Sequence, residues 1–188
     1  MRRLRMRSIR VPGFKFAGVS CGIKKSKKRD LALIFSERPA TAAALFTTNR
    51  VKAAPVLVGM RRMSGGIIQA VVVNSGNANA CTGSKGVRDA EGMCREAGLR
   101  LGIDPRLVIP SSTGVIGVPL PMEKVRIGIE KAASNLSADS FSHAAEAILT
   151  TDRFVKVASA TCRLKGRKVV LAGMVKGAGM IAPKMATM

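Results

Sequence analysis

A run of apolar residues, Ile67-Ile68-Gln69-Ala70-Val71-Val72-Val73, leads directly into a segment of small polar residues, Asn74-Ser75-Gly76-Asn77-Ala78-Asn79-Ala80-Cys81-Thr82-Gly83. The first part, rich in Val and Ile, is typical of a buried strand. Glycine allows a ligand to approach the backbone and asparagine offers both donors and acceptors, so the second part is a candidate binding site at a strand end. An ordinary Asn/Gly turn explains the same residues equally well.

Strands and helices alternate along the rest of the chain. Apolar runs between turn residues predict strands at Leu31 to Phe35, Val56 to Val58, Leu107 to Ile109 and Lys168 to Val175, with an alternating stretch from Val155 to Ser159. Helical spacing of apolar residues predicts helices over residues 87–101, 121–133 and 141–148, the first of them closed by Gly102. This order predicts one α/β or α+β domain, preceded by a basic extension over residues 1–10.

The composition is strongly basic. The 188 residues include 32 Lys and Arg against 11 Asp and Glu, a net charge of +21 with His neutral, so anionic partners are expected. There is no Trp or Tyr and only six Phe, which leaves little for base stacking. The densest basic run, Lys24-Lys25-Ser26-Lys27-Lys28-Arg29, is better explained as an exposed hairpin tip than as a nucleic-acid patch. A nucleic-acid-binding protein is nevertheless the rival function that this charge supports.

The sequence predicts neither a metal site, nor a membrane span, nor a secretory signal. Its four cysteines form no Cys-x-x-Cys pair and have only His143 as a nitrogen partner, so we expect reduced thiols and no metal site. No apolar run approaches the ~20 residues of a membrane span, and the Arg-rich start is not followed by the apolar segment of a secretory signal. A cytoplasmic protein is expected, because a mitochondrial transit segment would have little room before Val11.

Two further segments carry chemistry. Ser111-Ser112-Thr113-Gly114-Val115-Ile116-Gly117 follows a predicted strand, and a turn that sets a Thr hydroxyl beside a Gly N–H would supply two donors for an oxyanion in acyl transfer. A corner in which Ser and Thr cap their own backbone is the plainer interpretation. The C-terminal segment, residues 173–188, is rich in Gly but fits neither phosphate-binding fingerprint, because Lys176 precedes its Gly pair. Nucleotide binding is therefore not predicted.

Taken in order, these segments resemble the first half of the ornithine acetyltransferase family, which serves arginine biosynthesis. The resemblance covers nearly the whole chain. It is carried by Pro12-Gly13-Phe14, Ala17-Gly18-Val19, Ala40-Thr41-Ala42-Ala43, Thr48-Asn49-Arg50-Val51-Lys52-Ala53-Ala54-Pro55, the 74–83 segment, Ser112 to Gly117, Thr150-Thr151-Asp152, and Lys176-Gly177 through Met185-Ala186-Thr187-Met188. The fold that this family implies is a layered αββα sandwich, incomplete without its C-terminal half.

The resemblance implies a self-cleaving acyltransferase. Family precursors cut themselves at an Ala–Thr bond that corresponds to Ala186–Thr187, so residues 11–186 would be the α-chain domain and residues 187–188 the start of the β chain. Thr187 would then be the nucleophile, with its freed α-amine as the base. In a ping-pong cycle it would take the acetyl group from N-acetylornithine as an ester and pass it to glutamate.

Four other residues match functional positions of the family. Thr113 and Gly114 match the pair whose hydroxyl and backbone N–H form the oxyanion hole. Thr150 and Lys176 match substrate-binding positions, and the Lys176 ammonium would suit an amino-acid carboxylate. No cofactor is implied, although some members of the family accept acetyl-CoA as a substrate.

The family's second half supplies further site residues. The resemblance therefore implies a β chain from the same precursor, a heterotetramer of two α and two β chains, and an α chain that is inactive alone. Lys184, Ala178 and Arg153 depart from the family pattern without removing a matched site residue, although Lys184 lies close to the expected cleavage site. An aminopeptidase with the same self-cleaving architecture is a further alternative, which the detailed motifs disfavour.

Overall fold

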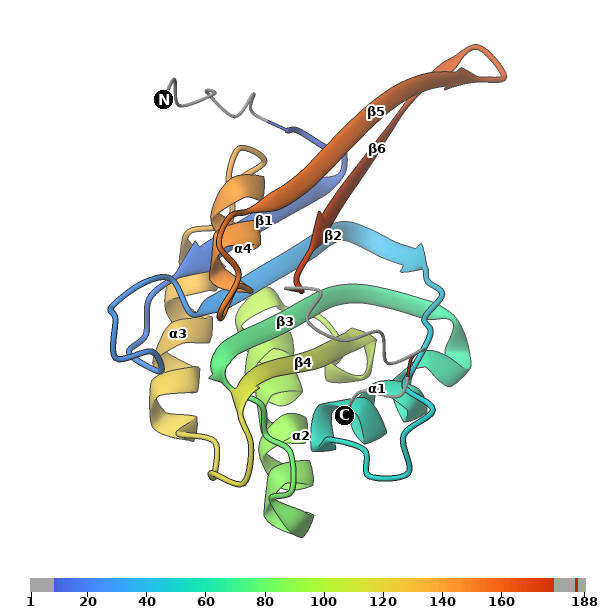
Figure 1. Ribbon diagram of the computed structural model, residues 1–188. Coiled ribbons are helices and arrows are strands. Elements are labelled where there is room, and N and C mark those ends of the chain that lie inside the picture. The colour runs from blue at the N-terminus through green and yellow to red at the C-terminus, as the bar shows by residue number, and fades with distance from the viewer. Residues whose placement is uncertain (1–8, 178–184, 186–188) are drawn as a thin grey trace.

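The computed structural model describes residues 9–177 and residue 185. Its centre is a four-stranded sheet with strand order β1-β2-β3-β4 (Figure 1). The strands are β1 (Phe14–Val19), β2 (Leu31–Thr41), β3 (Ile67–Asn77) and β4 (Val108–Val115). β1 and β3 each pair with β2 in antiparallel fashion, whereas β3 and β4 run parallel. The carboxyl ends of β3 and β4 therefore meet at the same edge of the sheet.

Three helices cover one face of this sheet: α1 (Ala54–Arg62), α2 (Gly83–Leu101) and α3 (Met122–Ser134). Short 3-10 turns at Met63–Gly65 and Pro105–Leu107 join α1 to β3 and α2 to β4. Alternate residues of β2, such as Leu31 and Leu33, point toward these helices because side chains alternate along a strand. The core here also contains Val19, Val58, Ala70, Val72, Met93, Val108, Val125 and Ile129.

The other face carries a smaller apolar cluster, beneath helix α4 (Phe141–Ala147). The Phe16 and Phe141 rings meet edge to face with their centroids 5.0 Å apart. Ala32 lies in this cluster, between Leu31 and Leu33, which belong to the first one. Apolar residues on both sides explain why β2 begins with an unbroken apolar run.

The last two strands, β5 (Lys156–Leu164) and β6 (Arg167–Val175), form a separate antiparallel hairpin. It projects away from the body of the molecule (Figure 1), and its base reaches the α4 cluster through Val157 and Met174. Apolar side chains along it are open, with Leu171 62% and Leu164 60% exposed. A two-stranded hairpin with exposed apolar residues is marginally stable by itself.

Most of the predicted elements are confirmed, and the fold is a layered α/β arrangement as expected. Gly102 has φ 65° and closes α2 in the left-handed conformation. The predicted strand at Val56–Val58 is wrong, because these residues lie inside α1. Pro55 stands at the first helical turn, where its missing N–H costs nothing, and an apolar run this short does not distinguish a strand from a helix. Strand β1 was not predicted from periodicity.

Within the described part of the chain, no helix is long and apolar enough to cross a membrane. The same residues contain no group of His, Cys, Asp and Glu that could hold a metal ion. All four cysteines are free thiols, with Cys94 buried and Cys81 and Cys162 exposed.

Candidate functional site

The parallel pairing of β3 with β4 brings the two polar segments of the sequence together. Ser75 lies opposite Thr113 and Gly76 opposite Gly114 in the register. The Ser112 hydroxyl donates to the Asn74 side-chain oxygen at 2.6 Å and ties the two strand ends to each other. Residues 112–115 are thus extended strand rather than the turn that the sequence suggested.

Gly114 has a conformation and a contact that other residues would not tolerate. Its φ is +137°, and a Cβ built on it would lie 2.3 Å from the carbonyl carbon of Gly76. Beside it, Thr113 is half-buried, and within the described residues its hydroxyl makes no hydrogen bond. A Thr hydroxyl and the backbone N–H of the glycine after it, which has no side chain to block an approaching group, are donors of the kind that stabilise an oxyanion.

The three asparagines at the carboxyl end of β3 and just after it make hydrogen bonds within this segment and to α2. Asn74 donates its side-chain amide to the Asn77 carbonyl at 2.8 Å, and the Asn77 side-chain oxygen accepts from the Asn79 N–H at 2.8 Å. Asn79 in turn donates to the Gly86 carbonyl in α2 at 2.9 Å. Of the two interpretations of the 74–83 segment, the structural one therefore applies to its asparagines, while one of its two glycines, Gly76, lies at the candidate site.

The β1–β2 loop folds against this strand end because of one buried acid, Asp30. Its carboxylate accepts from the N–H groups of Cys21 and Ile23 at 2.7 Å and of Lys24 at 3.0 Å. Its carbonyl accepts from the Ser75 N–H at 2.8 Å. Lys24 consequently lies over Gly76, so that a Cβ at Gly76 would be 3.1 Å from the Lys24 Cγ atom.

A second acid, Asp152, joins the segments that carry Thr150 and Lys176. Its carboxylate accepts from the Gly177 N–H at 2.8 Å, from the Thr150 N–H at 3.4 Å and from the Lys156 ammonium at 2.7 Å. Burial alone would raise the pKa of this carboxyl, but the three hydrogen bonds outweigh it and hold the pKa well below its usual range. Asp152 is therefore charged, and it keeps the end of β6 beside Thr150.

A cavity of about 700 Å³ opens between the β1–β2 loop and this junction. Its lining includes Lys24, Lys28, Thr150 and Asp152. Burial lowers the pKa of the Lys24 ammonium. The Asp30 charge opposes this shift, and the charges of Lys28 and Lys176 add to it. Lys176 directly precedes Gly177, whose N–H donates to the Asp152 carboxylate, so it belongs to the same junction. The candidate site runs from Gly114 through Gly76 and Lys24 to Thr150 and Lys176.

The expected cleavage residues, Ala186 and Thr187, lie outside the described residues. The residue before them, Met185, is held by the segment that follows β2. Its carbonyl accepts from the Thr48 N–H at 2.6 Å and from the Thr47 hydroxyl at 2.9 Å. Thr47 and Thr48 therefore bind the residue that directly precedes the predicted cleavage residues.

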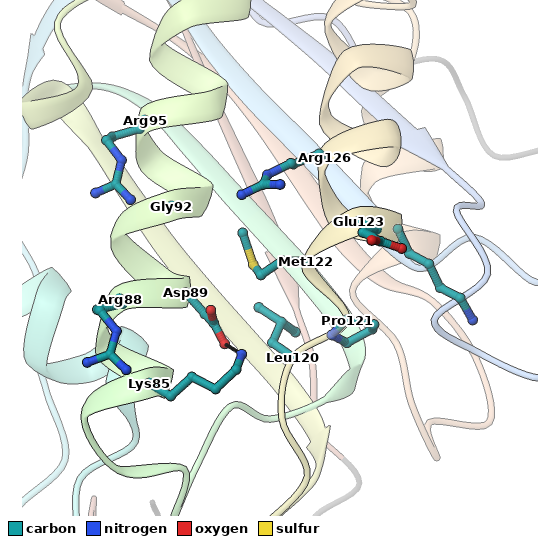
Figure 2. Close-up of a pocket in the computed structure, with 11 residues that line it drawn as sticks. Lys85, Arg88, Asp89, Gly92, Arg95, Leu120, Pro121, Met122, Glu123 and Arg126 are labelled. Atoms are coloured by element: carbon teal, nitrogen blue, oxygen red, sulfur yellow. Dashed lines mark hydrogen bonds and ion pairs between the residues drawn. The ribbon is translucent and has the colours of Figure 1, made fainter.

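A different cavity, of about 430 Å³, lies between α2 and α3 (Figure 2). Its floor includes Gly92 and Met122, and Lys85 and Asp89 form an ion pair of 2.6 Å at one end. None of the residues that the sequence marked as catalytic or substrate-binding lines this cavity, so it is separate from the candidate site.

Sequence reasoning missed the residues that hold the site together. It named neither Asp30 nor Gly76 as a structural contact, and it quoted Asp152 only as part of a motif. A signal for Asp30 was present, since it is a lone acid between the basic run and the buried start of β2. Fully buried acids must be paired or hydrogen-bonded, so an acid at a strand start implies a cluster of donors around it.

Comparison with known proteins assigns this arrangement to a family. The ArgJ family model matches residues 15–188. The arginine biosynthesis bifunctional protein ArgJ of Caldanaerobacter subterraneus subsp. tengcongensis is 55% identical over 176 residues, covering 94% of this chain and 43% of the relative. The ArgJ protein of Geobacter sulfurreducens is 51% identical, covering 95% of this chain and 45% of the relative. The chain thus spans less than half the length of these curated relatives.

Two solved structures share the fold over nearly their whole chains. The Bacillus halodurans ArgJ structure has a TM-score of 0.85 at 39% identity, covering 92% of this chain and 91% of that one. The structure of Mycobacterium tuberculosis ornithine acetyltransferase complexed with ornithine has a TM-score of 0.86 at 38% identity, covering 96% of each chain. With a family match over almost all of its length and relatives more than half identical to it, this chain belongs to the ArgJ family.

Proposed function

We propose that this chain is the α half of an acetyltransferase that moves an acetyl group from N-acetylornithine to glutamate in arginine biosynthesis. The observation that supports the proposal is the β3–β4 register, which pairs Gly114 with Gly76. Gly76 in turn contacts the Lys24 stem, and Lys24 lines the same cavity as Thr150. Membership in a family of arginine-biosynthesis proteins supports the reaction class.

The reaction proceeds in two acyl transfers through Thr187. The Thr187 hydroxyl loses its proton to the α-amine of the same residue and attacks the acetyl carbonyl of N-acetylornithine. The carbonyl oxygen becomes an oxyanion, which the Thr113 hydroxyl and the Gly114 N–H stabilise. The C–N bond then breaks, the ornithine amine leaves with the proton, and an acetyl ester remains on Thr187. The glutamate amine attacks this ester by the same path and restores the free hydroxyl.

Thr150 and Lys176 bind the amino-acid part of the substrate. The Asp152 carboxylate fixes both segments through the N–H groups of Thr150 and Gly177. A cationic Lys176 at this place attracts the α-carboxylate that both amino-acid substrates carry. The word bifunctional in the names of the relatives supports a second acetyl donor, for which acetyl-CoA is the candidate.

A β chain from the same precursor completes the site. The match to less than half of the curated relatives, but to nearly all of each solved chain, supports cleavage into two chains of which this is the first. The exposed apolar β5–β6 hairpin is suited to continue into a larger sheet supplied by that partner. The chain by itself is inactive, and the assembled enzyme is a cytoplasmic heterotetramer of two α and two β chains.

Expression of the full precursor and its Thr187→Ala variant tests the proposal. The wild-type precursor is expected to yield two chains, the second beginning at Thr187, and to transfer acetyl from N-acetylornithine to glutamate. Thr187→Ala is expected to leave a single inactive chain, whereas Thr161→Ala, an exposed threonine of β5, should process normally. Intact masses and N-terminal sequencing decide the point. Cleavage of the Thr187→Ala precursor, or acetyl transfer by the 188-residue chain alone, would contradict the proposal.

A further inference from the structure

The basic part of the β1–β2 loop, residues 24–29, forms one wall of the cavity that Thr150 also lines. Lys24, Lys27 and Lys28 all line this cavity, whereas Lys25 does not. The loop is thus the tip of an antiparallel hairpin, as its sequence predicts, but its cations are next to the candidate site rather than on a remote surface.

The two acids that line the cavity, Glu146 and Asp152, are each paired with a cation. Glu146 pairs with Arg29 at 3.0 Å, and Asp152 pairs with Lys156 at 2.7 Å. No ion pair within the described residues involves Lys24, Lys27 or Lys28, although Lys24 donates a hydrogen bond to the Arg29 carbonyl at 2.7 Å. The cavity therefore carries an excess of positive charge, which an anionic ligand would neutralise.

The loop is held rigidly enough to present that charge. Three N–H groups of residues 21–24 converge on the buried Asp30 carboxylate, and the Lys24 stem lies on Gly76. Arg29 also donates to the Gly18 carbonyl at 3.1 Å, which anchors the far end of the loop. A site whose backbone is fixed before the ligand arrives loses less entropy on binding.

We propose that Lys24 and Lys28 form a subsite for the side-chain carboxylate of the acidic acceptor, glutamate. The inference rests on the proposed function, whose two amino-acid substrates share an α-carboxylate and differ in the charge of the side chain. N-acetylornithine ends in an ammonium, which this wall repels, and glutamate ends in a carboxylate, which it attracts. Lys176 then holds the shared α-carboxylate, while the β1–β2 loop selects the acceptor and disfavours return of ornithine.

The test measures steady-state acetyl transfer by the assembled two-chain enzyme and its Lys24→Gln, Lys28→Gln and Lys25→Gln variants. Lys25→Gln is the matched control, because it removes the same charge from the same loop outside the cavity. Losing a hydrogen bond to a charged group should raise the KM for glutamate roughly tenfold in Lys24→Gln and in Lys28→Gln. The KM for N-acetylornithine should stay the same or fall. Lys25→Gln should match the wild type in its KM for glutamate and in its KM for N-acetylornithine.

The choice between glutamate and glutamine as acceptor gives a second readout. Glutamine has the same shape without the side-chain charge, so the wild-type preference for glutamate should shrink in Lys24→Gln and Lys28→Gln. Equal increases in KM for both substrates would mean that the loop binds the shared α-carboxylate, which overturns the inference. Variants indistinguishable from Lys25→Gln would overturn it as well.

Calorimetric titration with L-glutamate separates this inference from the proposed function. If the assembled wild-type enzyme transfers no acetyl group, the proposed function fails, and the titration still decides the subsite. Glutamate binding that weakens in Lys24→Gln but not in Lys25→Gln would support it. Glutamate binding that is absent, or equal in all variants, would overturn it. Thermal unfolding midpoints within the wild-type range would show that the variants are folded.

Discussion

Gly114 approaches Gly76 across the parallel β3–β4 pair so closely that a Cβ on Gly114 would lie 2.3 Å from the Gly76 carbonyl carbon and 2.7 Å from its oxygen. Backbone atoms on both strands make this contact, so no side-chain movement can relieve it. The same pair of glycines connects the candidate oxyanion donors on β4 to the Lys24 stem, which lies against Gly76. One close backbone contact thus sets the geometry of two parts of the candidate site.

Gly114→Ala is therefore expected to separate the two strand ends and to destabilise the protein by about 3 kcal/mol or more, because backbone must move to accept the methyl group. Gly117→Ala is the matched control. Gly117 also has a positive φ, +78°, but a Cβ there would meet nothing within 4 Å. Gly117→Ala should therefore lower the free energy of unfolding only by the backbone strain, about 1 kcal/mol. Urea unfolding of both variants measures the difference, and equal losses would contradict the backbone contact.

Thr113→Val should impair the chemical step while leaving substrate binding intact. Valine preserves the shape and removes the hydroxyl, so each tetrahedral intermediate loses one oxyanion donor, and kcat should fall roughly a hundredfold to a thousandfold with little change in KM. Ser111→Ala removes an exposed hydroxyl of the same strand and should leave kcat unchanged. Steady-state rates of the assembled enzyme check both. A Thr113→Val enzyme with wild-type kcat would remove Thr113 from the mechanism.

The elements that sequence alone predicted correctly are those whose signal is local. The valine run of β3 and the helical spacing of α2 depend on neighbours within one element, and both are confirmed. The error at Val56–Val58 arose where the run was too short for its period to show. Strand β1 was not predicted because its half-buried first residues and its buried glycine hide the apolar alternation.

The candidate site was only partly predictable, for a physical reason. Thr113, Gly114, Thr150 and Lys176 could be named from motifs, but their proximity depends on contacts between segments far apart in sequence. Asp30 and Asp152 create those contacts by collecting backbone N–H groups from loops, and nothing in the local pattern says which N–H groups a buried acid will collect. The position of Lys24 in the lining of the cavity could likewise not be predicted, because it depends on the pairing of β1 with β2.

The thiols should differ sharply in reactivity. Burial, with the nearby Asp30 charge, raises the pKa of Cys21 to about 12, and burial raises the pKa of Cys94 to about 12. Neither forms appreciable thiolate at pH ~8, so both should resist a disulfide reagent, whereas the exposed Cys81 should react quickly. Cys162 is exposed as well, so the double variant Cys81→Ser and Cys162→Ser should remove the fast phase of labelling. Rapid modification of Cys94 in the folded protein would contradict the core packing around α2.

Asp152→Asn should loosen the junction between Thr150 and Gly177, and its effect should depend on pH. The folded-state pKa of Asp152 is depressed, so its charge stabilises the fold fully above the unfolded value of about 4 and progressively less as the pH falls below it. The variant should therefore unfold at a lower temperature than the wild type at neutral pH. The difference between the two unfolding temperatures, the gap, should narrow in acid. Asp104→Asn removes an acid from an exposed pair with Arg106 and should change little at neutral pH. Thermal unfolding across this pH range decides the matter, since a gap that is constant or widens in acid would mean that the Asp152 charge does not hold the junction.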